Sequence, residues 1–201
     1  SCLVGSEMCI RDRGDCFKGF ASVHYLTGDT HINRAVANED MPAGYGNIFE
    51  HNMGAVCASW WWTGYISQNS ICKDGSEGGY MVFTNNGSDV KWRWKGMKVD
   101  AGKQFRSYDM NVVKNHYDTD ASVKAFLQKY PLRSRYAACK ANTVYINVWN
   151  WDSGWQISVK ENGQPLTVTQ IRAEDPLHNL SYDIPRTASN GSLTSSFATY
   201  N

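Results

Sequence analysis

Most of the chain alternates between strand-like segments and short turns rich in Gly, Asn and Asp, and this pattern limits the folds open to it. The clearest example is GGYMVFTNNGSDVKWRWKGM, residues 78–97, in which two alternating runs flank Asn86 and Gly87. An Asn-Gly pair supplies the positive φ angles that a tight hairpin turn requires. The segment therefore predicts a β-hairpin and indicates a mainly β chain.

Further strands are expected on both sides of this hairpin. ASVHYLT and NIFEHN read as strands before it, whereas the segment from Asp29 to Gly46 reads as a loop. After it, QFRSYDM predicts a strand, NTVYINVWNWDSGWQISV predicts a second hairpin that turns at DSG, and Asn162-Gly163 predicts a third tight turn. LSYDIP and SSFATY also have the pattern of short strands.

One helix is predicted near the middle of the chain. Apolar residues recur at helical spacing between Val123 and Tyr130, Thr119 or Asp120 can cap its start, and Pro131 follows its end. A meander of short strands with one helix indicates a β-sandwich. The best candidate for a linker is KGMKVDAGKQ, residues 95–104.

The composition excludes several classes of partner. The chain has 20 Lys and Arg against 19 Asp and Glu, so its net charge of +1 creates no overall field for nucleic acid or anionic membranes. No apolar run approaches the roughly 20 residues that span a bilayer. Basic and aromatic residues mix in DVKWRWKG, but strand alternation explains this, with Trp92 and Trp94 on one face and Lys91 and Arg93 on the other.

The first thirteen residues, SCLVGSEMCIRDR, resemble one reading frame of a transposon-type sequencing adaptor and lack the features of a signal peptide. We therefore expect residues 1–13 to be an artefact, with a genuine terminal segment as the alternative. The cysteines that remain include no Cys-x-x-Cys pair, so a structural zinc site is not expected. A hairpin could bring Cys57 to Cys72, and free buried cysteines are the alternative.

The segment VHYLTGDTHIN, residues 23–33, combines a strand with two metal-ligand residue types. The strand-like run ends at Gly28, and Asp29 and His31 follow it. A strand of this kind places both side chains at the carboxyl edge of a sheet, where open α/β sheets bind their ligands. Imidazole and carboxylate suit zinc, manganese or iron, and paired metals can activate water for phosphoryl transfer. The same spacing also fits a solvated turn.

At these residues the sequence resembles the calcineurin-like metallophosphoesterases, whose last metal-binding motif is Gly-His-x-His after a buried strand. NIFEHNMGAVCASWWWTGYIS, ICKDGSEGGYMVF and VKWRWKGM resemble the end of a bacterial group of these enzymes. RSYDMN, VYINVWNWDSGW and DPLHNLSYDIPR resemble the β-domain that this group carries at its C-terminus. The resemblance implies that Asp29 and His31 are metal ligands and that Gly28 forms the turn of the backbone.

The resemblance also implies a phosphomonoester or phosphodiester substrate and two divalent metal ions, Mn, Fe or Zn, in the intact parent enzyme. However, the family's Asp-x-His, Gly-Asp-x-x-Asp, Gly-Asn-His and further His motifs do not precede Gly28, and Asp29 stands where the family has a His. We therefore expect a fragment without activity of its own, against which a missing N-terminal catalytic core packs. Because such enzymes are often exported, we expect the parent to be periplasmic or extracellular.

In this interpretation the chain has two parts. Residues 14–97 complete the metallophosphoesterase α/β sandwich, and residues 98–201 form the β-sandwich-like C-terminal domain with one helix, itself truncated at its end. The overall class is mainly β with minor α.

Three other polar residues have ordinary structural explanations. His24 alternates with its neighbours along a strand, which is typical of a core or interface histidine. Glu50 and His51 are residue types suited to acid–base catalysis, but adjacent strand residues face opposite ways.

The eight tryptophans suggest a function of another class. Trp61, Trp149 and Trp151 could stack on sugar rings or meet a partner protein, which would make the chain a non-catalytic β-sandwich module. Packing between sheets, or against the catalytic core, is the competing explanation. An interdomain scaffold without a ligand is the third.

Overall fold

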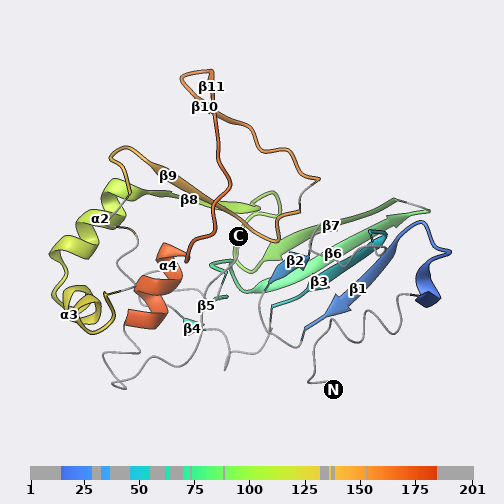
Figure 1. Cartoon of the computed structure of the whole chain (residues 1–201), viewed down its shortest axis with the longest axis horizontal. Coiled ribbons are helices and arrows are strands. Elements are labelled where there is room, and N and C mark those ends of the chain that lie inside the picture. The colour runs from blue at the N-terminus through green and yellow to red at the C-terminus, as the bar shows by residue number, and fades with distance from the viewer. Residues whose placement is uncertain are drawn as a thin grey trace.

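The computed structural model describes residues 15–28, 33–36, 46–54, 62–63, 70–72, 74–87, 89–131, 136, 139–152 and 154–184. Within these residues the chain is mainly β with three short α-helices, which confirms the predicted class (Figure 1). The proposed artefact at residues 1–13 and the predicted strand SSFATY lie outside them. None of the helices in the described part is long and apolar enough to cross a membrane.

The first layer is a three-stranded sheet in the order β1-β3-β2. Strands β1 (Val23–Thr27) and β3 (Ile48–Asn52) are parallel and confirm two predicted strands, and β2 (Arg34–Val36) pairs antiparallel with β3. A short 3-10 turn, Asp15–Phe17, precedes β1. The loop predicted from Asp29 to Gly46 is therefore wrong at β2, because three residues are too few to show a strand period.

The second layer is the hairpin of β6 (Gly79–Asn86) and β7 (Asp89–Gly96), as predicted. Gly87 has a φ of +71°, whereas Asn86 still pairs with Asp89, so the turn begins one residue later than expected. A further short pair, β4 (Trp62–Thr63) and β5 (Ser70–Ile71), is antiparallel.

The two layers pack through aromatic rings. The rings of Phe83 and Trp92 lie 5.1 and 4.5 Å from that of His51 on β3. Trp92 and the fully buried Trp94 lie on the inner side of β7, and the Lys91 and Arg93 side chains on its other side are exposed. This confirms the alternation that the sequence predicts for DVKWRWKG.

The second half is built on a ribbon of β8 (Phe105–Asp109) and β9 (Val144–Val148), which are antiparallel. The predicted hairpin from β9 through DSG is wrong. Asn150 has a φ of +52° and takes the chain out of the ribbon before the turn is reached. That turn does form, because Asp152 accepts a hydrogen bond from the Gly154 amide at 2.8 Å, but β9 pairs with β8 instead.

Helices α2 (Met110–Thr119) and α3 (Ala121–Lys129) connect these two strands. Helix α3 is the predicted helix, and Asp120 is its N-cap, accepting from the amides of Ser122 and Val123. The expectation of a single helix is wrong, because α2 and α4 (Pro176–His178) also form. Helix α4 continues as the π-helical turn η4 (Asn179–Asp183), so LSYDIP is not a strand.

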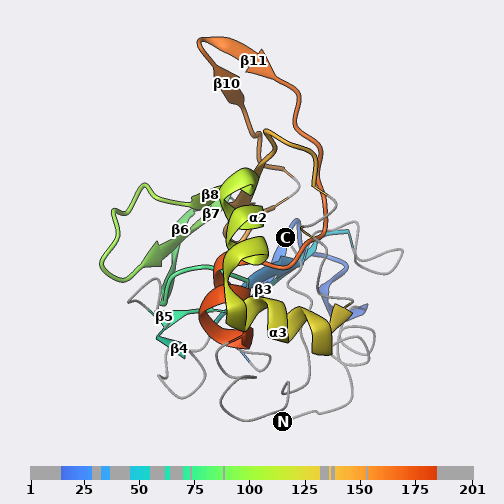
Figure 2. The same cartoon turned by 90° about the vertical axis from the view of Figure 1, so that its left-hand side faces the viewer.

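The helices and the ribbon share one hydrophobic core, formed by Met110, Val113, Tyr117, Val123, Phe126, Tyr136 and Ile184. Strands β10 (Val159–Glu161) and β11 (Gln164–Leu166) form the hairpin predicted at Asn162-Gly163, whose φ angles are +50° and +81°. Figures 1 and 2 show this hairpin projecting away from the rest of the chain.

The two predicted parts are packed together in this structure. Cys72 and Trp94 form a buried cluster with Trp149, which follows β9. The side chain of Gln104 accepts from the Trp94 amide at 3.0 Å and donates to the Trp94 carbonyl at 2.6 Å. The predicted linker, residues 95–104, is therefore a short connection whose last residue is hydrogen-bonded back to β7. The domain boundary predicted at residue 97 stays a prediction.

Candidate functional site

The described residues on either side of the predicted ligands lie at one edge of the three-stranded sheet. Because β1 and β3 are parallel, Thr27 and Asn52 end these strands at the same edge, and the Met53 amide donates to the Thr27 carbonyl at 2.7 Å. Gly28 follows immediately and is exposed. Parallel strands bind their ligands beyond this carboxyl edge.

Asp29 and His31 lie outside the described residues, but the structure describes Gly28 before them and Asn33 after them. Gly28 follows β1 at the carboxyl edge, and Asn33 directly precedes Arg34, which pairs with Asn52 at the end of β3. The chain therefore leaves and rejoins the sheet at the same edge. Nothing in the backbone of Gly28 demands a glycine, since its φ is outside the left-handed region and a Cβ would meet only the Met53 oxygen, at 3.9 Å.

Several buried oxygen atoms lie near this edge. The Thr27 hydroxyl donates to the Glu50 carboxylate at 2.8 Å. The side-chain oxygens of Asn33 and Asn52 are buried and accept no hydrogen bond from any described residue. Such oxygens suit hard cations. Within the described ranges, however, no group of three or more His, Cys, Asp and Glu residues could hold a metal ion, so these residues alone do not make a metal centre.

Strands β1 and β3 carry a pair of stacked histidines on the sheet face opposite to Thr27 and Glu50. His24 Nδ1 lies 2.9 Å from His51 Nε2, and the two rings are 9° from parallel. Burial, and secondarily His24, lowers the pKa of His51 to about 4, and burial lowers that of His24. Phe49 and Trp92 pack around them. His24 is half-buried where the two layers meet, which confirms the prediction of a core or interface histidine in its second form. Glu50 contacts Thr27 and His51 contacts His24, so these two neighbours face opposite ways as predicted.

A second polar site, which sequence reasoning missed, joins the two halves of the chain. We call it the junction cluster, and it consists of Asp74, Gly75, Glu77, Arg106, Tyr108, Asn147 and Asp175. Arg106 on β8 forms a buried ion pair with the Glu77 carboxylate and donates to the Gly75 carbonyl at 2.5 Å. Its guanidinium also lies 5.4 Å from the centre of the Trp149 ring.

Asp175 is the acceptor at the centre of the junction cluster. Its Oδ2 accepts from the Tyr108 hydroxyl at 2.6 Å and from the Asn147 amide at 2.8 Å. Its Oδ1 caps α4 by accepting from the His178 backbone amide at 2.8 Å. Asn147 also donates to the Asp74 carbonyl. Burial raises the pKa of Asp175 in spite of these donors.

The chemistry of the junction cluster is structural. Its carboxylates are buried and hydrogen-bonded within the protein, and they hold four separate segments together. Burial raises the pKa of Asp74 to about 7, and the Ser76 hydroxyl donates to it at 2.9 Å. One signal was visible in the sequence, since Asp175 before Pro176 is the pattern of an N-cap followed by a first-turn proline.

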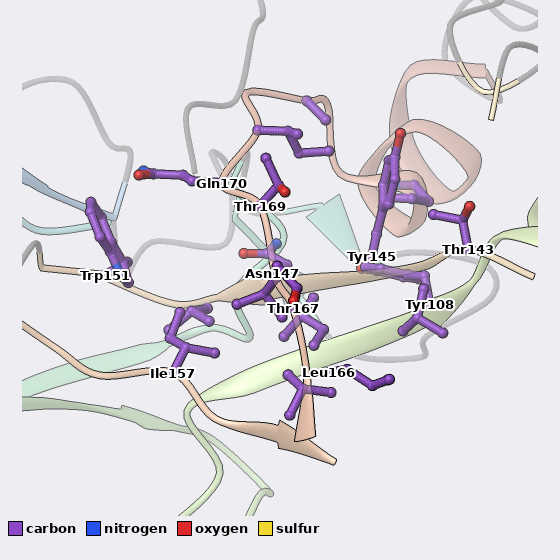
Figure 3. A pocket seen from close by; sticks show the side chains of 18 of the residues that line it. Tyr108, Thr143, Tyr145, Asn147, Trp151, Ile157, Leu166, Thr167, Thr169 and Gln170 are labelled. Atoms are coloured by element: carbon purple, nitrogen blue, oxygen red, sulfur yellow. The ribbon is translucent and has the colours of Figure 1, made fainter. Parts of the chain in front are cut away.

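A groove of about 800 Å³ lies beside the junction cluster (Figure 3). One wall is β9, and the other is the chain from Ile157 to Ile171 on either side of the projecting hairpin. Tyr108, Asn147 and Asp175 reach it from the cluster. Most of the remaining lining is apolar.

The three tryptophans considered as sugar or partner contacts differ in position. Trp149 is fully buried between the two halves, so its ring is not available to a sugar. Trp151 is half-buried and lines the groove (Figure 3). Trp61 lies outside the described residues. Cys72 is buried and makes no disulfide; Cys57 is not described.

The chain was also compared with known proteins. Residues 50–197 match the family model described as C terminal of Calcineurin-like phosphoesterase. No curated protein and no solved structure matches the chain. Because the match covers most of the chain and includes both the junction cluster and the groove, the protein belongs to the family of C-terminal domains of calcineurin-like phosphoesterases.

Proposed function

We propose that this chain is the C-terminal region of a metal-dependent phosphoesterase, in which Asp29 and His31 supply two of the metal ligands. The observation that carries the proposal is the position of their neighbours. Gly28 and Asn33 both lie at the carboxyl edge of a parallel strand pair, where such sheets bind ligands. Membership of a phosphoesterase-associated family supports the reaction class.

Metal ions bound there would activate water and stabilise charge on the phosphoryl oxygens of a phosphate ester. The described residues fit such a site only in part, since they offer the Asn33 and Asn52 oxygens but no complete ligand group. In the proposal, Asp29 binds through its carboxylate and His31 through its imidazole. The remaining ligands belong to a catalytic core outside this chain, which packs against it.

The first test is activity. We expect the purified chain, with Mn²⁺, Zn²⁺ or Fe²⁺, to hydrolyse neither p-nitrophenyl phosphate nor bis-p-nitrophenyl phosphate, because two ligands do not assemble a bimetal site. Metal-dependent turnover that His31→Ala abolishes would show that the chain is active by itself.

The second test is metal binding by isothermal titration with Mn²⁺ and Zn²⁺. We expect Asp29→Ala and His31→Ala each to weaken binding by about tenfold. A matched control is His116→Ala, which removes a partly exposed histidine from α2 and should leave binding unchanged. If all three variants bind like the wild type, Asp29 and His31 are not ligands.

The alternative function is a non-catalytic module that binds glycan or a partner, and Trp151 in the groove is the observation that favours it. A glycan at this site would quench tryptophan fluorescence without any metal, and Trp151→Ala would remove the effect. The buried Trp149 weakens this alternative, because only one of the two described rings is accessible.

We also propose, from the resemblance alone, that the parent enzyme is exported. Fractionation of cells that express the complete reading frame would test this.

A further inference from the structure

Strand β9 has one open edge among the residues that the structure describes. It belongs to a two-stranded sheet in which β8 is its only described neighbour. A free strand edge presents unpaired amides and carbonyls to which another strand can add, and proteins usually protect such edges with charged residues or proline. Strand β9, whose sequence is VYINV, contains neither. Its open edge is therefore unprotected.

The register of the ribbon determines which backbone groups point to this edge. At one end of the ribbon, the Trp149 amide donates to the Gln104 carbonyl at 2.8 Å. At the other end, the Met110 amide donates to the Thr143 carbonyl at 3.0 Å. Because hydrogen-bonded and non-hydrogen-bonded pairs alternate along an antiparallel ladder, every second residue of β9 turns its amide and carbonyl away from β8. Counted from these two pairs, the residues that do so are Val144, Ile146 and Val148. None of the described residues hydrogen-bonds to these outward groups.

The groove of about 800 Å³ runs beside this edge (Figure 3). All of residues 142–148 line it, whereas Tyr108 is the only residue of β8 that does. Successive side chains of a strand point to opposite faces, so a hollow lined by every residue in a row lies along the strand edge and not over one face. The chain at residues 166–171 forms the far wall. A wall on that side favours a lone extended segment as the occupant over the edge of a second sheet.

The lining indicates which residues the occupant carries. The apolar residues that line the groove from its two walls include Val144, Ile146, Val148, Ile157, Leu166, Val168 and Ile171. The charged residues that line it are all acidic, namely Glu161, Glu174 and Asp175, and Glu161 is exposed. Charge complementarity therefore favours an occupant that combines apolar residues with a basic one, and disfavours an acidic occupant.

We propose that the open edge of β9 binds an extended segment of a partner protein, which adds to the ribbon as a further strand. Its backbone pairs with the outward amides and carbonyls of β9, its alternate apolar residues lie in the groove, and a Lys or Arg approaches Glu161. Asn142 and Asn150, whose φ angles are +59° and +52°, turn the chain away at the two ends of β9. The segment that fits is therefore short, about five to seven residues. The metal site proposed above plays no part in it, so the two proposals are tested independently.

A synthetic peptide tests the proposal directly. The probe is fluorescein-labelled Lys-Val-Thr-Val-Thr-Val-Lys, titrated with the full chain and followed by fluorescence anisotropy. We expect saturable binding with a Kd below about 1 mM, because its valines alternate as in a strand and its lysines complement the acidic lining. The same peptide with N-methyl groups on its interior amides keeps every side chain but cannot donate, so it should bind about tenfold more weakly or worse. No saturable binding, or equal binding by the N-methylated peptide, overturns the proposal.

Ile146→Pro tests the edge from the side of the protein. It removes an amide that points to the open edge and no hydrogen bond of the ribbon, so the fold should persist and peptide binding should weaken by about tenfold or more. The matched control is Ser107→Pro, since Ser107 pairs with Ile146 and its amide points to the opposite edge of the ribbon. Binding should survive that change, and equal losses in the two variants would contradict the proposal. If Ile146→Pro unfolds, the N-methylated peptide still decides.

Amide hydrogen exchange, resolved by residue in NMR spectra, gives a pattern that only strand addition produces. The peptide should slow exchange at Val144, Ile146 and Val148 and leave Tyr145 and Asn147, whose amides already face β8, unchanged. Uniform slowing along β9 would speak against pairing at the edge. If the three outward amides are already slow without peptide, the edge is occupied by the same chain or by a second copy, which sedimentation distinguishes, and the proposal is wrong.

Discussion

The carboxylate of Asp175 fills the space beside the α-carbon of Gly75. A Cβ built at position 75 would collide with all three atoms of that carboxylate, and Gly75 has a φ of +81°. The loop before β6 and the start of α4 are far apart in the sequence, but they pack so closely here that position 75 has no room for a side chain. The junction cluster therefore fixes how the two halves meet.

Gly75→Ala should cost more than about 3 kcal/mol of unfolding free energy, because strain in a left-handed backbone adds to the collision with Asp175. The control is Gly163→Ala in the β10–β11 turn, which has the same φ of +81° but no atom within 4 Å of the new Cβ. That variant should lose only about 1–2 kcal/mol in urea unfolding. Equal losses would show that Asp175 does not constrain Gly75.

Arg106→Ala should destabilise the chain by about 3–5 kcal/mol, because it leaves the Glu77 carboxylate buried without its cation. Adding Glu77→Gln should recover part of this loss by removing the buried charge. On the surface, Lys91 lies 3.3 Å from Asp89 with both side chains exposed, so Lys91→Ala should cost no more than about 0.5 kcal/mol. Chemical denaturation of the variants measures each value, and a loss at Arg106 as small as that at Lys91 would contradict the buried pair.

Asp74 should make the chain less stable as pH rises from 4 to 7. Burial raises its pKa from 3.8 to about 7, so in this window the folded state holds a proton that the unfolded state has released. Asp74→Asn keeps an oxygen to accept from Ser76 but cannot ionise. The stability of this variant relative to the wild type should therefore grow between pH 4.5 and pH 7.5. A constant difference would mean that Asp74 does not titrate in this range.

His51 should act in the opposite direction at acid pH. Burial, with His24 as the second cause, lowers its pKa from 6.5 to about 4. Between these values the unfolded chain binds a proton that the folded chain does not, so stability falls as pH falls. His51→Gln should therefore lose less stability between pH 6.5 and pH 4 than the wild type does, as measured by thermal unfolding. The wild-type slope in the variant would contradict this.

Local patterns predicted those elements whose partners are close in the sequence. The Asn-Gly turns at Gly87 and Gly163, and the helix between Asp120 and Pro131, are specified by the residues that form them. The ribbon could not be predicted in this way. Val144 pairs with Asp109 across two helices, whereas the visible turn at DSG suggested a local partner.

The same distinction explains which residues the sequence could single out. Asp29 and His31 stand out because one short segment carries both. They lie outside the described residues, so their role stays a prediction, and the structure places only their neighbours Gly28 and Asn33 at the carboxyl edge of the sheet. The junction cluster was invisible because Gly75, Arg106, Asn147 and Asp175 come from four segments that only the tertiary fold brings together. Helix α2 was missed although Asp109 caps it and Met110, Val113 and Tyr117 share its buried face.

The double hydrogen bond of Gln104 to Trp94 has a consequence for how the second half can move. A domain on a flexible linker would sample many orientations. Here Gln104 hydrogen-bonds the turn between the halves to Trp94, and the indole rings of Trp94 and Trp149 are buried in one cluster. The start of the ribbon is therefore held against β7 at two points, the Gln104 side chain and the buried indole of Trp149. A rotation of the second half about this turn would have to break both hydrogen bonds and expose both indoles, so the two halves should move as one body.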